Sequence, residues 1–135
     1  MPPLARLALA YAPARLRADW LAVLALDARL AKVVRQAREP MLAQIRLAWW
    51  RERLAADPAG WPRGEPVLAA LAAWGEAAPR LVPLVDGWEA LLGDPPLAGD
   101  SHALFADGRG VAMGALAARA EVDPARAEAA GRQWA

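Results

Sequence analysis

The sequence predicts an all-α fold, and three observations lead to this prediction. Alanine and leucine dominate the 135 residues, and in a helix alanine loses no side-chain entropy and leucine loses little. Apart from seven tryptophans, the residues typical of strands are scarce, and no useful length of sequence alternates apolar with polar residues. Prolines and glycines also divide the chain into pieces of helical length. We expect residues 1–135 to form one helical domain.

The first two helices are expected at residues 4–11 and 14–38. In the longer one, apolar residues recur at helical spacing and form one stripe, while Arg35 and Arg38 lie off it. Pro40 cannot continue that helix, but it fits the first turn of the next one. The stripe consists of Leu16, Trp20, Val23, Leu24, Leu30 and Val34.

The middle of the chain predicts two further helices, at residues 41–56 and 67–78. The sequence Asp-Pro-Ala-Gly at residues 57–60 predicts the turn between them, and Glu65-Pro66 opens the second helix. The first helix carries Leu42, Ile45 and Trp49 on one side with Leu47, Trp50 and Leu54 beside them, and the second has an apolar face of Val67, Leu68, Leu71 and Trp74.

The last part of the chain predicts a short helix at residues 83–92, a loop at 93–100 and a helix at 101–120 that begins at Ser101. Interior glycines weaken a helix by up to about 1 kcal/mol each relative to alanine. The three in the 101–120 helix therefore indicate that another backbone or a ligand approaches closely there; they are Gly108, Gly110 and Gly114. A final helix is expected from residue 123 to the end, where the sequence carries no stop signal.

Composition excludes several classes of protein. A formal net charge of +1 gives no large field to attract nucleic acid, and the absence of cysteine excludes disulfides and thiolate chemistry. The single histidine, His102, has no second ligand at metal-binding spacing, so we expect it at the surface. The apolar runs at residues 20–26 and 67–74 are shorter than the ~20 residues of a membrane span. We expect a cytoplasmic location, at most peripheral to a membrane.

One stretch of the chain resembles a known family. Residues 11–54 contain Glu-Pro-Met at 39–41 and Ile-Arg-Leu-Ala-Trp-Trp-Arg-Glu at 45–52. These strings are similar to the opening of squalene/phytoene synthase family proteins, and weaker similarity continues at residues 66–74, 81–94, 103–117 and 129–135. The resemblance implies a helical bundle like the N-terminal part of the trans-isoprenyl diphosphate synthase (terpenoid synthase) fold.

The resemblance also implies a chemistry that this sequence does not support. In the family, two aspartate-rich segments hold Mg²⁺, which bridges to the diphosphate of a prenyl substrate, and two such substrates are joined head to head. The positions of the first segment fall on Ala31, Lys32 and Arg35, and two of these residues are cations that repel a metal ion. The second segment is expected after residue 135. We therefore predict no catalytic residues, no bound metal and a truncated, inactive scaffold, a pseudoenzyme.

Five residues are candidates for binding a ligand: Asp27, Arg46, Trp49, Trp50 and Phe105. Asp27 is the only acid near the family's metal position, but pairing with a nearby Lys or Arg explains it as well. Arg46 with the two indoles one turn later suits an anionic ligand with an apolar part, whereas core packing with an arginine stacked on an indole is the simpler alternative. Phe105 stands where the family often has a tyrosine.

Three functions therefore stay open. The first is an inactive or fragmentary member of the family, retaining its helical scaffold. The second is a protein of the assembly-factor type, which works through an exposed apolar face on a protein partner or on a second copy of the chain. The third is an isoprenoid-binding module that holds a prenyl diphosphate without turnover.

Overall fold

The computed structural model describes residues 14–92 and 99–119, and within them no strand occurs, which confirms the all-α prediction. The predicted helices at 4–11 and 123–135, and most of the predicted loop at 93–100, lie outside the described residues. The elements, in order, are α2 (Ala14–Gln36), α3 (Pro40–Ala55), the 3₁₀ turn η1 (Pro58–Gly60), α4 (Pro66–Leu71), the 3₁₀ stretch η2 (Ala72–Leu81), α5 (Val82–Glu89) and α6 (Gly99–Arg119).

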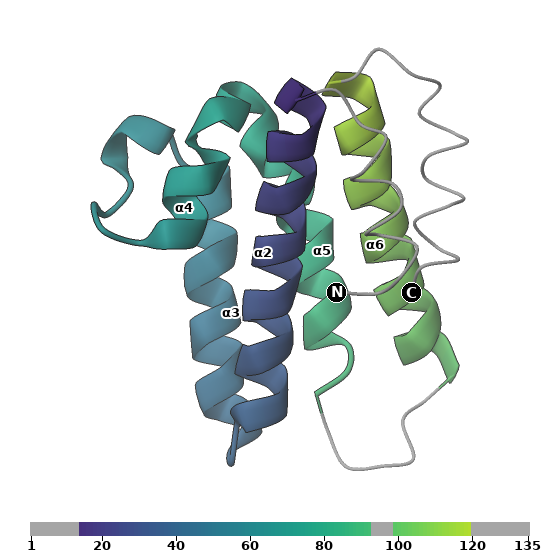
Figure 1. Cartoon of the computed structure of the whole chain (residues 1–135). Helices are drawn as coiled ribbons and strands as arrows, with labels where there is room; N and C mark the ends of the chain where they lie inside the picture. The colour runs from purple at the N-terminus through teal and green to yellow at the C-terminus, as the bar shows by residue number, and fades with distance from the viewer. Residues whose placement is uncertain (1–13, 93–98, 120–135) are drawn as a thin grey trace.

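The longer helices form an up-and-down bundle (Figure 1). Helix α2 runs down in this view, α3 returns beside it, α5 descends behind α2, and α6 rises on the far side. The short α4 and η2 close the upper end of the bundle. Each long helix therefore packs against antiparallel neighbours, which short connections favour.

Three of the predicted start signals lie where the structure begins an element, whereas α6 begins at Gly99, two residues before the predicted Ser101. Pro40 occupies the first turn of α3, after an extended Glu39. The side chain of Asp57 accepts a hydrogen bond from the Ala59 amide at 2.9 Å and begins η1. Glu65 accepts one from the Leu68 amide at 2.9 Å and caps α4, whose first residue is a proline.

The prediction of one continuous helix over residues 67–78 is wrong. Helix α4 ends at Leu71 and continues as 3₁₀ structure, and Gly75 adopts a φ of 51°, which interrupts the helix. Only glycine enters this left-handed region without steric cost. Pro79 adds to the effect because it lacks a backbone N–H and restricts the residue before it. The predicted apolar face nevertheless holds, since Val67, Leu68, Leu71 and Trp74 are all buried.

The core lies where the inward faces of these helices meet. On α2, Val23 and Leu30 from the predicted stripe are buried, whereas Trp20 and Val34 pack at the edge of the core. On α3 the buried side is the one with Leu47, Trp50 and Leu54, and the side with Leu42 and Ile45 faces solvent. The largest fully buried side chains are Leu26, Leu30, Leu47, Leu54, Leu68, Leu71, Leu81, Leu84, Leu116, Val23 and Val85.

Helices α5 and α6 approach each other more closely than a side chain would allow. A Cβ at Gly108 would collide with the Pro83 carbonyl oxygen and would lie 3.3 Å from the Gly87 Cα, and a Cβ at Gly87 would lie 3.2 Å from the Phe105 Cα. Of the glycines predicted to permit a close approach, Gly108 lies against the backbone of another helix, α5.

Charged pairs connect the helices across the bundle. Asp19 and Asp27 on α2 bind Arg119 and Arg109 on α6, each with an N–O distance of 2.9 Å, and this crossed order follows from the antiparallel arrangement. Both aspartates are buried.

On the other side of the bundle, Arg51 of α3 donates to Asp86 at 2.8 Å and to Glu89 at 2.5 Å, both on α5. Burial opposes the charge on Arg51, but the hydrogen bonds and negative charges of these two carboxylates outweigh it and raise the pKa of Arg51 above its ordinary value.

One stretch, Pro66–Glu89, is long and apolar enough to cross a membrane by length and composition. From the lengths of the apolar runs in the sequence, no membrane span is expected here. This is weak evidence for membrane insertion, because the core helices of soluble proteins pass the same test. In the structure the stretch comprises α4, η2 and α5, is broken at Gly75, and turns its Leu and Trp side chains into the core. The cytoplasmic location stays a prediction.

Candidate functional site

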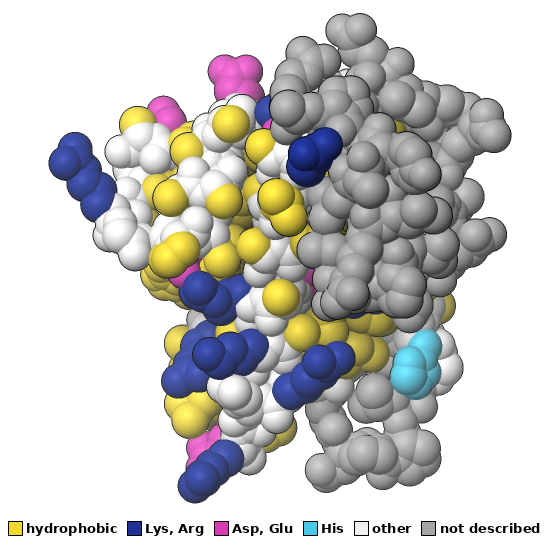
Figure 2. All heavy atoms as spheres, viewed as in Figure 1, with side chains coloured by type: hydrophobic (Ala, Val, Ile, Leu, Met, Phe, Trp, Pro, Cys, Tyr) yellow, Lys and Arg dark blue, Asp and Glu magenta, His cyan; other side chains and the backbone are white. Residues whose placement is uncertain are grey.

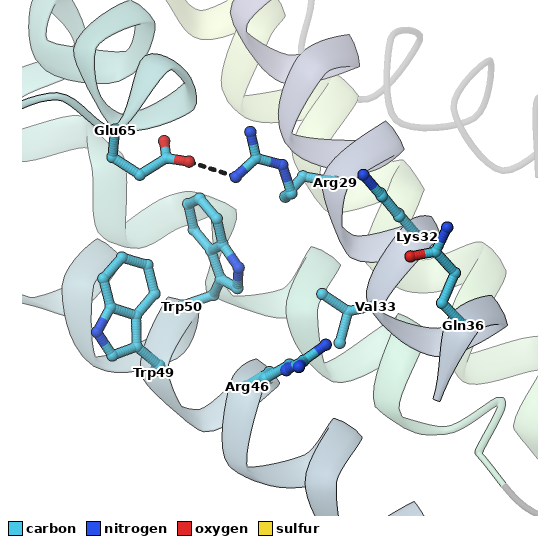
Figure 3. A pocket seen from close by; sticks show the side chains of 8 residues that line it. All are labelled: Arg29, Lys32, Val33, Gln36, Arg46, Trp49, Trp50 and Glu65. Atoms are coloured by element: carbon cyan, nitrogen blue, oxygen red, sulfur yellow. Dashed lines mark hydrogen bonds and ion pairs between the residues drawn. The ribbon is translucent and has the colours of Figure 1, made fainter. Parts of the chain in front are cut away.

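A pocket of about 400 Å³ opens between α2, α3 and the residue that caps α4. Its lining side chains project from three segments (Figure 3). They are Arg29, Lys32, Val33 and Gln36 from α2, Arg46, Trp49 and Trp50 from α3, and Glu65 before α4.

Helical spacing explains why these residues share one space. On α2 they recur every three or four residues, and on α3 Arg46 is followed by the indoles three and four residues later, so each set lies on one helix face. Trp50 is buried and its ring meets that of Trp49 edge to face, with centroids 5.0 Å apart and planes at 89°. The two indoles thus form an apolar wall that is fixed by the core beneath it.

Cations dominate the charge around this wall. The Arg29 guanidinium forms an ion pair with Glu65 and lies 5.8 Å from the centroid of Trp50. Lys32 and Arg46 are exposed, and neither has an ion-pair partner among the described residues. Three positive side chains therefore face one carboxylate, which is already occupied by Arg29 and by the Leu68 amide. The pocket suits an anion with an apolar portion.

The structure brings together three of the five predicted ligand-binding residues, namely Arg46, Trp49 and Trp50. Their role in binding stays a prediction. The simpler alternative, an indole buried in the core with an arginine stacked on it, describes Trp50 itself, but its stacking partner is Arg29 rather than Arg46.

Asp27 and Phe105 lie outside this pocket, in a second cluster between α2, α5 and α6. Asp27 accepts hydrogen bonds from the Trp88 indole N–H and from Arg109, each at 2.9 Å. The Phe105 ring meets the Trp88 ring with centroids 4.7 Å apart, and the Arg109 guanidinium lies 4.6 Å from the Phe105 centroid. Asp27 is therefore satisfied within the fold, and its cationic partner comes from α6 rather than from its own helix.

The residues that the structure describes form no magnesium site. Among residues 14–92 and 99–119 no group of three or more His, Cys, Asp or Glu side chains could hold a metal ion. Of the family positions, Ala31 is buried, Lys32 lines the pocket, and Arg35 lies with its guanidinium 5.9 Å from the centroid of Trp88. His102 is exposed on α6, as expected.

Sequence reasoning missed Arg29, Gln36 and Glu65 as pocket residues. Arg29 and Gln36 carry a detectable signal, because they share the helix face of Lys32 at spacings of three and four residues. Glu65 was interpreted only as the start of a helix, and its contact with Arg29 joins residues 36 apart in the chain.

The chain was compared with protein families, curated proteins and solved structures. A family model described as squalene/phytoene synthase matches residues 5–88, more than half of the chain and a range that includes every residue lining the pocket. Neither the curated proteins nor the solved structures gave a match.

Proposed function

The chain belongs to the squalene/phytoene synthase family, and we propose that it is a binding protein of this family rather than a catalyst, holding a prenyl diphosphate in the α2–α3 pocket without a metal ion. The observation that carries the proposal is the pairing, in one pocket, of the cations Arg29, Lys32 and Arg46 with the indole wall of Trp49 and Trp50.

Charge supports diphosphate as the polar part of the ligand. Lys32 and Arg46 project from facing helices and leave N–H donors available for phosphate oxygens, and charge-assisted hydrogen bonds are about twice as strong as neutral ones. Arg29 is held beside them by Glu65, so it adds a positive potential even while it is paired.

The indoles support a prenyl chain as the apolar part. Trp49 and Trp50 present ring edges and faces next to the cations, and burial of hydrocarbon against such surfaces is worth about 25 cal/mol per Å². A pocket of about 400 Å³ lies in the lower range of small-ligand sites and accommodates the diphosphate with the first part of the chain.

The same arrangement favours binding over turnover. The family reaction requires that negative charge on the departing diphosphate be neutralised as the carbon–oxygen bond breaks, and Mg²⁺ supplies most of that stabilisation. The described donor set does not fit Mg²⁺. Lysine and arginine alone supply less positive charge at the departing oxygen than Mg²⁺ with its coordination shell, so we expect them to hold the diphosphate without turnover.

The binding experiment is a fluorescence titration of the full chain with farnesyl diphosphate in the presence of a chelator. We expect saturable quenching of indole emission, weaker binding of inorganic pyrophosphate, and still weaker binding of farnesol. Lys32→Gln and Arg46→Gln should each weaken farnesyl diphosphate binding by about ten- to a hundredfold, since a charge-assisted hydrogen bond contributes about 1.5–3 kcal/mol.

Arg80→Gln is the matched control, because Arg80 is an exposed cation on η2 that does not line the pocket. Binding that depends on Mg²⁺, or that is unaffected by Lys32→Gln and Arg46→Gln, contradicts the proposed site. Turnover is tested separately with Mg²⁺ and farnesyl or geranylgeranyl diphosphate. A head-to-head product formed by this chain would show that the inactive interpretation is wrong.

A further inference from the structure

The outer face of α3 exposes an unusual amount of apolar surface. Met41, Leu42 and Ile45 are 68%, 52% and 61% exposed. They make up three of the five large apolar residues that are exposed in the described part of the chain. At 100° per residue they share the side of α3 opposite its buried face, which consists of Ala43, Leu47, Trp50 and Leu54. We call Met41, Leu42 and Ile45 the α3 outer face.

Positive charge lies beside this face, on the end of α2, in the connection to α3 and on the pocket side of α3. The segment from residue 32 to residue 46 contains four exposed cations and one exposed acid, Glu39. Figure 2 shows Lys and Arg side chains gathered over the lower part of α2 and α3, with apolar side chains along the adjoining edge. The four cations are Lys32, Arg35, Arg38 and Arg46.

We propose that the α3 outer face docks the protein on an anionic membrane surface. A helix lying in the membrane interface needs apolar side chains on one side and cations that reach the lipid phosphates along its flanks. The α3 outer face supplies the first, and the neighbouring cations supply the second. This inference goes beyond the proposed function and does not depend on it.

The charge balance favours a lipid surface over a protein. Apart from Arg35, which lies over the Trp88 ring of α5, three exposed cations stand against one acid here. This balance matches the uniform negative potential of anionic headgroups, whereas a protein interface with this face would have to supply clustered acids around an apolar centre. The three apolar side chains also project from a single exposed helix face, which can insert between lipids and needs no complementary groove.

Docking in this way would place the pocket beside the lipids. Trp49 lies one turn after Ile45 on the same side of α3, and it is half-buried at the pocket edge, where the Arg53 guanidinium stacks on it. Indoles favour the boundary between hydrocarbon and headgroups. A membrane-dissolved isoprenoid would then enter the pocket next to the site of attachment.

The test is vesicle flotation of the full chain, with vesicles of phosphatidylcholine alone or mixed with phosphatidylglycerol. We expect flotation with the anionic vesicles only, weakened by high salt because exposed charges are screened. The triple variant Met41→Ser, Leu42→Ser, Ile45→Ser should lower partitioning by about a hundredfold, through loss of three inserting side chains. Arg38→Gln should lower it by about fivefold.

Two controls match these changes. The double variant Leu21→Ser, Leu104→Ser removes exposed leucines from α2 and α6, and Arg80→Gln removes an exposed cation from η2; both should float as the parent does. Urea unfolding shows whether the variants keep the native stability, as expected for exposed positions. Pyrophosphate binding by the triple variant should be unchanged, which separates this test from that of the pocket.

Three outcomes overturn the proposal. The first is failure of the parent chain to float with anionic vesicles. The second is equal flotation of the parent and the triple variant. The third is a self-associated parent that does not bind vesicles and that the triple variant converts to a monomer, since the α3 outer face is then an interface between copies of the chain.

Discussion

The buried pair of Asp27 and Arg109 offers the sharpest test of how this scaffold is held together. The two side chains are only 10% and 13% exposed. The carboxylate accepts two hydrogen bonds from Arg109, at 2.9 and 3.4 Å, and one from the Trp88 indole N–H at 2.9 Å. Asp27→Ala removes both acceptors and leaves a guanidinium with little access to water.

The expected cost follows from these contacts. Removing one partner of a buried ion pair destabilises a protein by about 3–5 kcal/mol, because the other charge is left uncompensated. Asp27→Asn retains an oxygen for Trp88 and loses only the charge, so we expect a loss of about 1.5–3 kcal/mol. Asp86→Asn is the control, because it makes the same change in a pair whose carboxylate is 56% exposed, where about 1 kcal/mol or less is expected.

The assay is equilibrium unfolding in urea, followed by tryptophan fluorescence and circular dichroism. A double variant, Asp27→Asn with Arg109→Met, should lose less than the sum of the single losses by about 1–3 kcal/mol, which isolates the pair itself. If Asp27→Ala stays within about 0.5 kcal/mol of the parent, the size of a neutral surface change, the buried-pair reasoning is refuted. If Mg²⁺ stabilises the parent but not Asp27→Ala, the carboxylate serves a metal instead.

Three other predictions concern packing, the pocket and metals. Gly108→Ala should lower the free energy of unfolding by about 1–3 kcal/mol, because the added Cβ collides with the Pro83 carbonyl; the helix preference of alanine offsets part of this loss. Gly99→Ala, which has nothing within 4 Å of its added Cβ, should be neutral, and thermal unfolding of the two variants tests this. Glu65→Gln keeps an oxygen that accepts from the Leu68 amide at the start of α4, but it removes the negative charge paired with Arg29. Pyrophosphate should therefore bind several-fold tighter in a calorimetric titration, and weaker binding would refute this. Millimolar Mg²⁺ should leave the melting temperature unchanged, since the described residues hold no metal cluster; a rise specific to Mg²⁺ would contradict this.

Much of the fold could be predicted from the sequence because its signals are local. Pro40 and Pro66 mark the starts of helices, and Asp57 marks a turn, through chemistry that acts within one turn; the structure has helices that begin at Pro40 and Pro66 and a 3₁₀ turn after Asp57. Gly108 indicated a close approach because glycine destabilises a helix relative to alanine, so a packing contact is expected where it occurs. The structure places the Pro83 carbonyl against it.

What could not be predicted depends on contacts between distant parts of the chain. The partner of Asp27 lies 82 residues away, so its identity follows from the placement of α6 and not from any spacing on α2. On α3 two apolar sides compete, and only the packed bundle shows that Leu47 and Trp50 are buried while Ile45 is exposed. The break at Gly75 was missed because the apolar spacing of residues 67–74 continues regularly up to it.

The crossed pairs Asp19–Arg119 and Asp27–Arg109 have a mechanical consequence. The two aspartates lie about 12 Å apart along α2, at 1.5 Å per residue, and a single register of α6 forms both ion pairs. If α6 slid by a single turn, both ion pairs would break at once and all four charged side chains would lose their partners. The register of α6 against α2 is therefore fixed at one position and does not shift gradually. The bundle resists sliding along α6 until both ion pairs break.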